Sequence, residues 1–388
     1  MSTMATHTHP ATIDRRTLLR CAAALGLTAS AGIVLAACGG TASTPAATGT
    51  AGAPATKAPT TTTGAATATT ASAAAGAAST GTTSSATMNV RMACWSQPIS
   101  EQANIFGAQE NGWFKAQGID FSFVPGAGGG DALKNILAGN AEFAFTNVEP
   151  LLFAIQEGAK LRAIYNIYPQ NVFNLLTLKS SGLTSVAALK GRKVGVYSQS
   201  SGTRYNLLVM LKSAGLKESD VEVVAAGIAN FGPLADGKVD ATAATDTGLY
   251  GAQQGGLRDL DVLWARDVLN TPSDIFVVTE DMYQKKKDLI ARFLRAYKQG
   301  TQWMLDKPDA AAEVAVKYAT DGKEIARNRA IIDIRNASTV SDATKANGLG
   351  FFDMELLKKV DATFFDLGIT RQHFEMDKIF TNEFLADL

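Results

Sequence analysis

The feature that most limits how this sequence can fold is a long stretch without large side chains. From Gly39 to Thr87 the chain uses only Gly, Ala, Ser, Thr and Pro, apart from Lys57. Such a segment has no apolar surface whose burial would offset the entropy of ordering it, so we expect 38–87 to be a disordered linker. A flexible coil of this length spans about 35–42 Å between its ends. The folded part is therefore expected from Met88 onward.

A short export signal precedes the linker. Arg15 and Arg16 are followed by an uncharged stretch that begins at Cys21, and this stretch is short for a bilayer-spanning helix and ends in small residues. Its last residues, Leu35-Ala36-Ala37-Cys38, resemble the bacterial lipobox, whose cysteine is acylated and becomes residue one after cleavage. We therefore expect a twin-arginine signal peptide over 1–37 and a lipid anchor at Cys38 on the outer face of the cytoplasmic membrane. Sec routing and an uncleaved membrane anchor remain open alternatives.

Charge and cysteine content exclude several classes of function. The 36 Lys and Arg residues balance 36 Asp and Glu residues, so no basic surface favours a nucleic acid partner. After cleavage only Cys38 and Cys94 remain, and Cys38 carries lipid, so no disulfide framework is expected. His7 and His9 leave with the signal, and His373 remains alone. The sequence therefore predicts no metal site, no catalytic triad and no cofactor.

Strand and helix patterns alternate along the folded part. The first predicted strands are 90–95, 119–124, 141–145, 161–165 and 172–178, and Asp131 is expected to cap the helix that ends at Ala138. A second series follows at 192–197, 221–225, 241–245, 262–264 and 275–279. Short strands separated by helices predict an α/β protein with parallel βαβ units in a doubly wound sheet. We expect two lobes with a hinge, one formed by 88–175 plus 275–388 and the other by 176–274.

Three motifs carry a resemblance to a known family. They are Asn111-Gly112-Trp113-Phe114-Lys115-Ala116-Gln117-Gly118-Ile119-Asp120, the run Leu-Ala-Gly-Asn-Ala-Glu-Phe-Ala at 137–144, and Leu-Lys-Gly-Arg-Lys-Val-Gly-Val at 189–196. Together they resemble ABC-importer solute-binding proteins for sulfonates, nitrate or thiamine pyrimidine precursors, with riboflavin-binding proteins as the nearest subgroup. The resemblance covers 88–320. It implies a type II periplasmic-binding-protein fold with an interlobe cleft, a monomer, and an ABC permease and ATPase as partners.

Polar and aromatic residues follow the predicted strands, where loops are expected to converge on a ligand. The candidate ligand-binding residues of the first lobe are Trp95, Ser96, Gln97, Asn147, Glu149, Tyr168 and Asn171. Those of the second lobe are Ser198, Ser200, Thr203, Asn230, Phe231 and Asp246. This mixture of rings, amides, hydroxyls and carboxylates suits a planar, uncharged ring with hydrogen-bonding edges. Trp95 also fits core packing, and Asn147 and Asp246 also fit helix caps.

The solute is chosen by charge and by resemblance. Glu149 and Asp246 would repel an anion, whereas the only candidate anion site combines Arg204 with the amides near Ser201. We therefore expect riboflavin first, a thiamine pyrimidine precursor second and an aliphatic sulfonate third.

Two other classes of function remain as alternatives. Thiamine-pyrimidine synthases look similar in fold, but the chain lacks their cysteine-rich iron motif, and His373 lies far from the cleft loops in sequence. We therefore expect no enzyme. A sensory lipoprotein of the same fold is the second alternative, and no sequence feature separates it from a transport protein.

Overall fold

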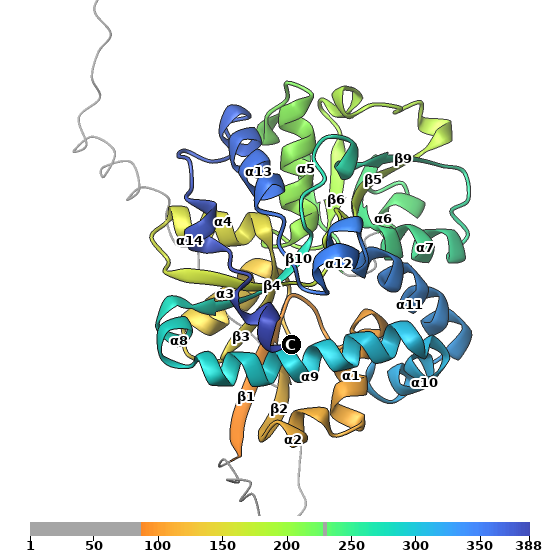
Figure 1. The fold of residues 1–388 in the computed structure, drawn as a ribbon. Helices are drawn as coiled ribbons and strands as arrows, with labels where there is room; N and C mark the ends of the chain where they lie inside the picture. Colours follow the sequence, from red (N-terminus) through yellow and green to blue (C-terminus); the bar gives the residue numbers. More distant parts are fainter. Residues whose placement is uncertain (1–86, 228–230) are drawn as a thin grey trace, which may run out of the picture. The chain divides into compact units, whose positions relative to one another are not determined.

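Two five-stranded sheets with helices around them form the folded part of the protein (Figure 1). The computed structural model describes residues 87–227 and 231–388. All of them belong to one unit, Ser79–Leu388. The expected signal peptide, the lipidation site Cys38 and the linker up to residue 86 lie outside the described residues.

The first sheet, sheet A, has the strand order β2-β1-β3-β10-β4. Its strands are β1 (Met88–Cys94), β2 (Ile119–Val124), β3 (Phe143–Asn147), β4 (Leu161–Asn166) and β10 (Asp274–Thr279). β1 pairs in parallel with β2 and β3, but β10 is antiparallel to both β3 and β4. The expected parallel βαβ units are therefore present, and β10 is an antiparallel addition to them. The chain leaves sheet A after β4 and returns from the opposite direction, so its returning strand runs against its neighbours.

The second sheet, sheet B, repeats this plan with the order β7-β6-β8-β5-β9. Its strands are β5 (Phe173–Leu178), β6 (Lys193–Val196), β7 (Glu222–Ala225), β8 (Ala241–Thr245) and β9 (Leu260–Trp264). Here β5 is the antiparallel strand, paired with β8 and β9. The strand that enters each sheet from the other one is thus the reversed strand in both.

Helices surround both sheets. We define lobe A as sheet A with α1 (Ala103–Glu110), α2 (Trp113–Ala116), α3 (Gly129–Leu137), α4 (Val148–Gln156), α8 (Glu280–Lys285), α9 (Lys287–Asp306), α10 (Pro308–Tyr318), α11 (Ile325–Thr339), α12 (Asp342–Asn347), α13 (Met354–Asp366) and α14 (Met376–Ile379). Lobe B is sheet B with α5 (Gly202–Ser213), α6 (Gly232–Ala235) and α7 (Asp246–Gln254). Helix α3 begins at Gly129, with Gly128 as its N-cap. Asp131 therefore lies in its first turn and is not the expected cap.

Alternate residues of the central strands enter two different cores. In β1, Val90 and Met92 pack in one cluster with Phe293 of α9, whereas Ala93 packs on the other side with Leu133 of α3. Successive side chains of a strand point to opposite faces, so a strand that is apolar on both faces must lie between two helix layers. The near-continuous apolar runs of the sequence reflect this double burial.

The chain passes between the sheets twice, from β4 to β5 and from β9 to β10. The two passages are hydrogen-bonded to each other, because the amides of Ile167 and Tyr168 both donate to the carbonyl of Asp274, at 2.8 and 3.1 Å. Strand β5 lies entirely in sheet B, so the lobe boundary expected after residue 175 falls inside a strand and the passage precedes Phe173.

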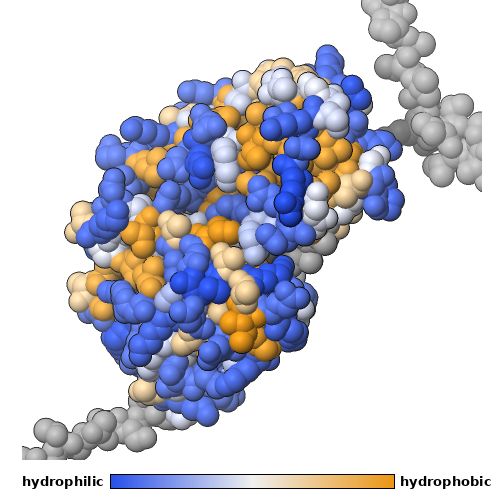
Figure 2. Space-filling view, turned by 90° about the vertical axis from the view of Figure 1, so that its right-hand side faces the viewer, coloured by the Kyte–Doolittle hydropathy of each residue, from blue (hydrophilic) through white to orange (hydrophobic). Residues whose placement is uncertain are grey.

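Within 87–227 and 231–388 no helix is both long enough and apolar enough to cross a bilayer. On the face drawn in Figure 2, hydrophobic residues lie in separate patches among hydrophilic ones.

Candidate functional site

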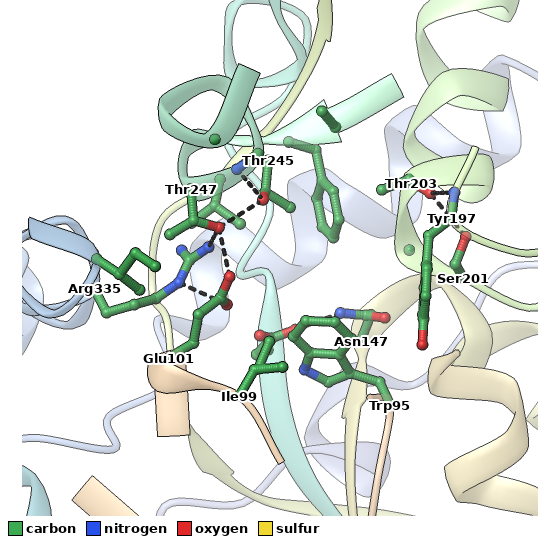
Figure 3. A pocket seen from close by; sticks show the side chains of 18 of the residues that line it. Trp95, Ile99, Glu101, Asn147, Tyr197, Ser201, Thr203, Thr245, Thr247 and Arg335 are labelled. Atoms are coloured by element: carbon green, nitrogen blue, oxygen red, sulfur yellow. Dashed lines mark hydrogen bonds and ion pairs between the residues drawn. The ribbon is translucent and has the colours of Figure 1, made fainter. Parts of the chain in front are cut away.

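A cavity of about 270 Å³ lies between the two lobes (Figure 3). Residues at the carboxyl ends of four strands line it: Trp95 follows β1, Asn147 ends β3, Tyr197 follows β6 and Thr245 ends β8. Parallel strands bring their carboxyl ends to the same edge of a sheet, where connecting loops can surround a ligand. The cavity is therefore built from equivalent edges of the two sheets.

Aromatic rings from both lobes line the cavity. The rings of Trp95 and Tyr197 meet edge to face, with centroids 6.1 Å apart and an interplanar angle of 85°. Phe173 and Phe231 of lobe B complete the aromatic lining. The Nε1 atom of Trp95 is buried and has no hydrogen-bond partner among the described residues. The site thus offers apolar ring surfaces from both lobes.

A carboxyl group and an amide form the floor of the cavity. Asn147 donates from Nδ2 to Oδ1 of Asp274 and, at 3.3 Å, to the carbonyl of Ser273. Asp274 is only 4% exposed. Burial, the largest effect, raises the pKa of Asp274 well above its usual value, and nearby carboxylates add to this while Arg335 opposes it.

A buried arginine joins the two lobes at one side of the cavity (Figure 3). Nε of Arg335 donates to Glu101 of lobe A at 2.9 Å, and Nη2 lies 2.7 Å from Oδ1 of Asp246 in lobe B. Nη2 also donates to Thr247, whose hydroxyl donates to Glu101. Burial opposes the charge of Arg335, but the two carboxylates outweigh it and raise the pKa, so the guanidinium stays charged.

Two loops meet across the cleft at the opposite side. The glycine loop, residues 126–130 of lobe A, contacts the serine loop, residues 198–201 of lobe B. The amide of Gly130 donates to the carbonyl of Ser200 at 3.0 Å, and the hydroxyl of Ser200 donates to the carbonyl of Ala127 at 3.3 Å. A Cβ atom at Gly128 would lie 2.6 Å from the hydroxyl oxygen of Ser200. Only a glycine permits this close approach.

A second ion pair, between Asp321 and Arg327, lines the cavity on lobe A. Asp321 accepts hydrogen bonds at Oδ1 from the amide and the hydroxyl of Ser100, at 3.0 and 2.8 Å. Arg327 donates to the carbonyl of Asp321 at 2.8 Å, and its guanidinium lies 3.5 Å from the Asp321 carboxylate. Both lining arginines thus have a carboxylate partner.

The sequence of this chain matches a known protein family. Residues 99–311 match the family described as NMT1/THI5 like. The chain belongs to the NMT1/THI5-like family. The matched range includes strands and helices of both lobes and most of the residues that line the cavity.

Proteins similar in sequence to this NMT1/THI5-like chain have different named activities. It is 24% identical over 297 residues to the riboflavin-binding protein RibY of Chloroflexus aurantiacus, which covers 74% of this chain and 83% of RibY. It is also 24% identical over 225 residues to the 4-amino-5-hydroxymethyl-2-methylpyrimidine phosphate synthase THI12 of Saccharomyces cerevisiae, covering 55% of this chain and 66% of the yeast protein.

Solved structures share the fold. The alkanesulfonate-binding protein SsuA of Xanthomonas axonopodis pv. citri, bound to MOPS, matches 76% of this chain and 99% of its own, with a TM-score of 0.59 and 16% identity. The periplasmic aliphatic sulphonate binding protein SsuA of Escherichia coli matches 75% of this chain and 91% of its own, with a TM-score of 0.58 and 19% identity. The NMT1/THI5-like chain therefore has the periplasmic-binding-protein fold expected from its sequence.

Four of the predicted ligand residues line the cavity. They are Trp95, Asn147, Thr203 and Phe231. Thr203 lies in the first turn of α5, where its hydroxyl accepts from the amide of Tyr197 at 2.9 Å. The structure therefore brings these four together from both lobes.

Three predicted residues of lobe A have side chains held by other protein groups or directed elsewhere. Ser96 is buried and donates to the carbonyl of Gln97 at 2.7 Å. Gln97 is exposed and lines a separate surface depression. Glu149 is buried and accepts from Asn206 at 3.0 Å. None of the three lines the cavity.

The other predicted residues that the structure describes do not line the cavity, although some of them contact residues that do. Tyr168 lies under Arg335, whose Cζ is 5.1 Å from its ring centroid, and Asp246 forms the ion pair with Arg335. Asn171 donates to Asn206 and to the carbonyl of Leu269. Ser198 and Ser200 belong to the serine loop. Asn230 lies outside the described residues.

Several lining residues were missed by the sequence reasoning. They are Ile99, Glu101, Tyr197, Asp274, Asp321, Arg327, Ile331 and Arg335. Tyr197 is the last residue of the predicted strand 192–197, and Asp274 directly precedes the predicted strand 275–279, so extending every loop search by one residue would have found them. Arg335 lies within a long helix, and no local pattern marks it.

Metal-binding and nucleophilic side chains can be placed relative to the cavity within the described residues. No group of three or more His, Cys, Asp or Glu side chains in the described ranges could hold a metal ion. Cys94 is fully buried, and this burial raises the pKa of its thiol to about 12. His373 bonds to Asp361 and is not among the lining residues. The lining supplies rings, amides and hydroxyls, which can hold and orient a small molecule.

Proposed function

We propose that this chain is the extracytoplasmic solute-binding component of an ABC importer and that it binds riboflavin between its lobes. The observation that carries the proposal is a single cavity lined by Trp95 of lobe A and Tyr197 of lobe B. A solute that contacts both lobes stabilises the closed arrangement, as a transport receptor requires. The likeness to RibY over 74% of the chain supports the choice of solute.

The size and charge of the cavity support a neutral, planar solute. About 270 Å³ lies just below the usual range of small-molecule sites, roughly 300–1,000 Å³, so the cavity suits a small solute better than a peptide. Arg335 and Arg327 are both engaged by carboxylates, and Asp274 adds another acidic group. A sulfonate would meet no unpaired cation among the described lining residues.

A thiamine pyrimidine precursor is the second candidate. The Asn147–Asp274 pair presents amide and carboxyl groups that suit an aminopyrimidine edge. The named activity of the yeast relatives adds an enzyme reading, but the described lining residues include no lysine, cysteine or histidine. We therefore favour capture of the solute over its conversion.

Flavin fluorescence tests the proposal directly. Riboflavin is titrated with the purified full chain, and stacking on Trp95 and Tyr197 is expected to quench its emission with a Kd of about 1 µM or tighter. Trp95→Leu should weaken binding at least about tenfold, since it removes the aromatic ring that lines the cavity. Trp113→Phe is the matched control, because Trp113 packs against Trp303 and does not line the cavity.

The competing solutes separate the outcomes. Unchanged flavin emission, together with tight binding of 4-amino-5-hydroxymethyl-2-methylpyrimidine or of an alkanesulfonate, would replace riboflavin with that solute. Release of a chemically altered product from any of these compounds would instead support the enzyme reading.

Anchoring belongs to the same proposal and has its own test. The lipobox-like run before Cys38 supports acylation of this residue after removal of 1–37. Cys38→Ser should move the expressed protein from the membrane fraction to the soluble fraction, and mass spectrometry of the wild-type N-terminal peptide should show acyl chains. A wild-type protein that keeps its first residues and carries no lipid would contradict this part.

A further inference from the structure

The carboxyl group of Asp274 has one oxygen engaged and one open to the cavity. Oδ1 accepts the hydrogen bond from Nδ2 of Asn147. Oδ2 has no hydrogen-bond partner among the described residues and is not enclosed by protein. The residue as a whole is only 4% exposed, and it lines the cavity. Asp274 is therefore a buried polar group that faces the solute space with an unused atom.

The surroundings of Asp274 disfavour its charged form. Among the described residues no cation bonds to it, and Arg335, which acts on it electrostatically, is already paired with Glu101 and Asp246. The charged and titratable groups that act on Asp274, or on which it acts, are Arg335, Glu101, Glu149, Asp246, Cys94, Tyr168 and Tyr297. Carboxylates outnumber the one arginine in this set, and burial raises the pKa of Asp274 well above its usual value.

The bond from Asn147 fixes where the proton lies. An amide N–H needs an acceptor, so Oδ1 serves as the carbonyl oxygen of the acid and the proton resides on Oδ2. A carboxylic acid kept neutral by its environment is a hydrogen-bond donor. The floor of the cavity thus presents an O–H group to whatever the cavity holds.

We propose that Asp274 acts as a neutral acid that determines specificity, donating from Oδ2 to a ring nitrogen or carbonyl oxygen of the solute. This inference rests on the proposed binding function and narrows its solute class. The solute must place an unprotonated acceptor at the floor, because an N–H group there would leave two donors facing each other without a partner. Ionised Asp274 presents only acceptors, so deprotonation weakens binding.

Two substitutions at Asp274 separate donation from charge. Asp274→Asn keeps an acceptor for Asn147 and a donor toward the solute without an ionisable group, and it should weaken riboflavin binding by no more than about tenfold. Asp274→Leu removes the donor and should weaken binding at least about a hundredfold, as the loss of a buried polar contact to a substrate does. Asp361→Asn changes another buried aspartate, whose partner is His373 outside the cavity, and should leave the Kd unchanged.

The pH dependence gives the second readout. The Kd of the full chain for riboflavin is measured from about pH 6 to about pH 9, with thermal melting of every variant as the check on folding. Wild-type affinity should stay level while Asp274 is protonated and fall about tenfold per pH unit above its pKa. The Asp274→Asn protein should show a level profile throughout.

The outcomes distinguish this inference from the proposed function. Wild-type affinity that rises with pH, a folded Asp274→Asn protein as weak as Asp274→Leu, or an Asp274→Leu protein that binds as wild type would overturn the neutral-acid role alone. Absence of riboflavin binding by the wild type at every pH would remove both the ligand and the inference that rests on it.

Discussion

Arg335 of α11 and Asp246 of α7 form a buried ion pair between the two lobes, with 2.7 Å between Nη2 and Oδ1. Glu101 completes the arrangement from lobe A, so one guanidinium serves two carboxylates. The Arg335 side chain is 1% exposed. Charges removed from water to this extent are costly unless every one of them has a partner, and this cost makes the group sensitive to the loss of any member.

Removing the arginine should strongly destabilise the protein. Arg335→Ala leaves Glu101 and Asp246 without a cation, and we expect a loss of about 3–5 kcal/mol in the free energy of unfolding, measured in urea. Arg371→Ala breaks an exposed ion pair with Glu157 and should change it by at most about 0.5 kcal/mol. Equal effects of the two substitutions would show that the Arg335 group is hydrated in solution.

A methyl group at Gly128 should hinder closure of the lobes. Gly128→Ala places Cβ against Ser200 and at a φ of 140°, so we expect at least about a tenfold loss of solute affinity because the closed state becomes less populated. Gly139→Ala is the control, since Gly139 has a φ of 73° and open space around it. It should cost about 1 kcal/mol of stability and leave affinity unchanged. Small-angle scattering should show a more open Gly128→Ala protein, and an unchanged profile would contradict the prediction.

The carboxyl group of Glu149 should make stability depend on pH. Burial raises its pKa from 4.5 to about 7 in the folded state. Between these values the folded state binds the proton and the unfolded state releases it, so stability falls as pH rises and levels off above about pH 7, by about 3 kcal/mol in all. Glu149→Gln should lose the share of this dependence that comes from Glu149 and keep the share from Asp274, whose pKa is also raised by burial, whereas exposed Glu157→Gln should keep both; urea unfolding at about pH 5 and pH 8 measures the difference.

The thiol of Cys94 should be unreactive in the native protein. Its pKa of about 12 leaves a very small thiolate fraction at about pH 8, so alkylation should be about a thousandfold slower than in the unfolded chain. Mass spectrometry of the peptide that contains Cys94 follows the reaction with and without guanidinium. Native labelling at the unfolded rate would mean that the strand β1 opens readily.

The positions of the strands along the chain were predictable because each central strand is a short apolar run between turns. Val90 and Met92 mark β1 by burial on a strand face, and the same logic found the strands of sheet B. The reversal of β5 and β10 was not predictable from local patterns. Strand direction depends on how the chain returns to a sheet, and the apolar pattern is the same in either direction.

The lining residues of the site were predictable only where they lie at or directly after the end of a strand. Trp95 and Asn147 lie at such ends and line the cavity. Asp246 was also chosen on this ground, but its carboxylate is taken by Arg335, which lies 89 residues further along the chain. A partner so distant in sequence leaves no local signal, so the role of either residue emerges only from the fold.

Asp274 contributes to two parts of the structure through its side chain and its main chain. Its side chain lies on the floor of the cavity, and its main-chain carbonyl holds Ile167 and Tyr168 of the neighbouring passage. A solute held in the cavity would therefore contact a residue whose main chain is hydrogen-bonded to the passage between the sheets. A substitution of Asp274 that changes which solute is bound is therefore expected to change the rates of solute binding and release as well.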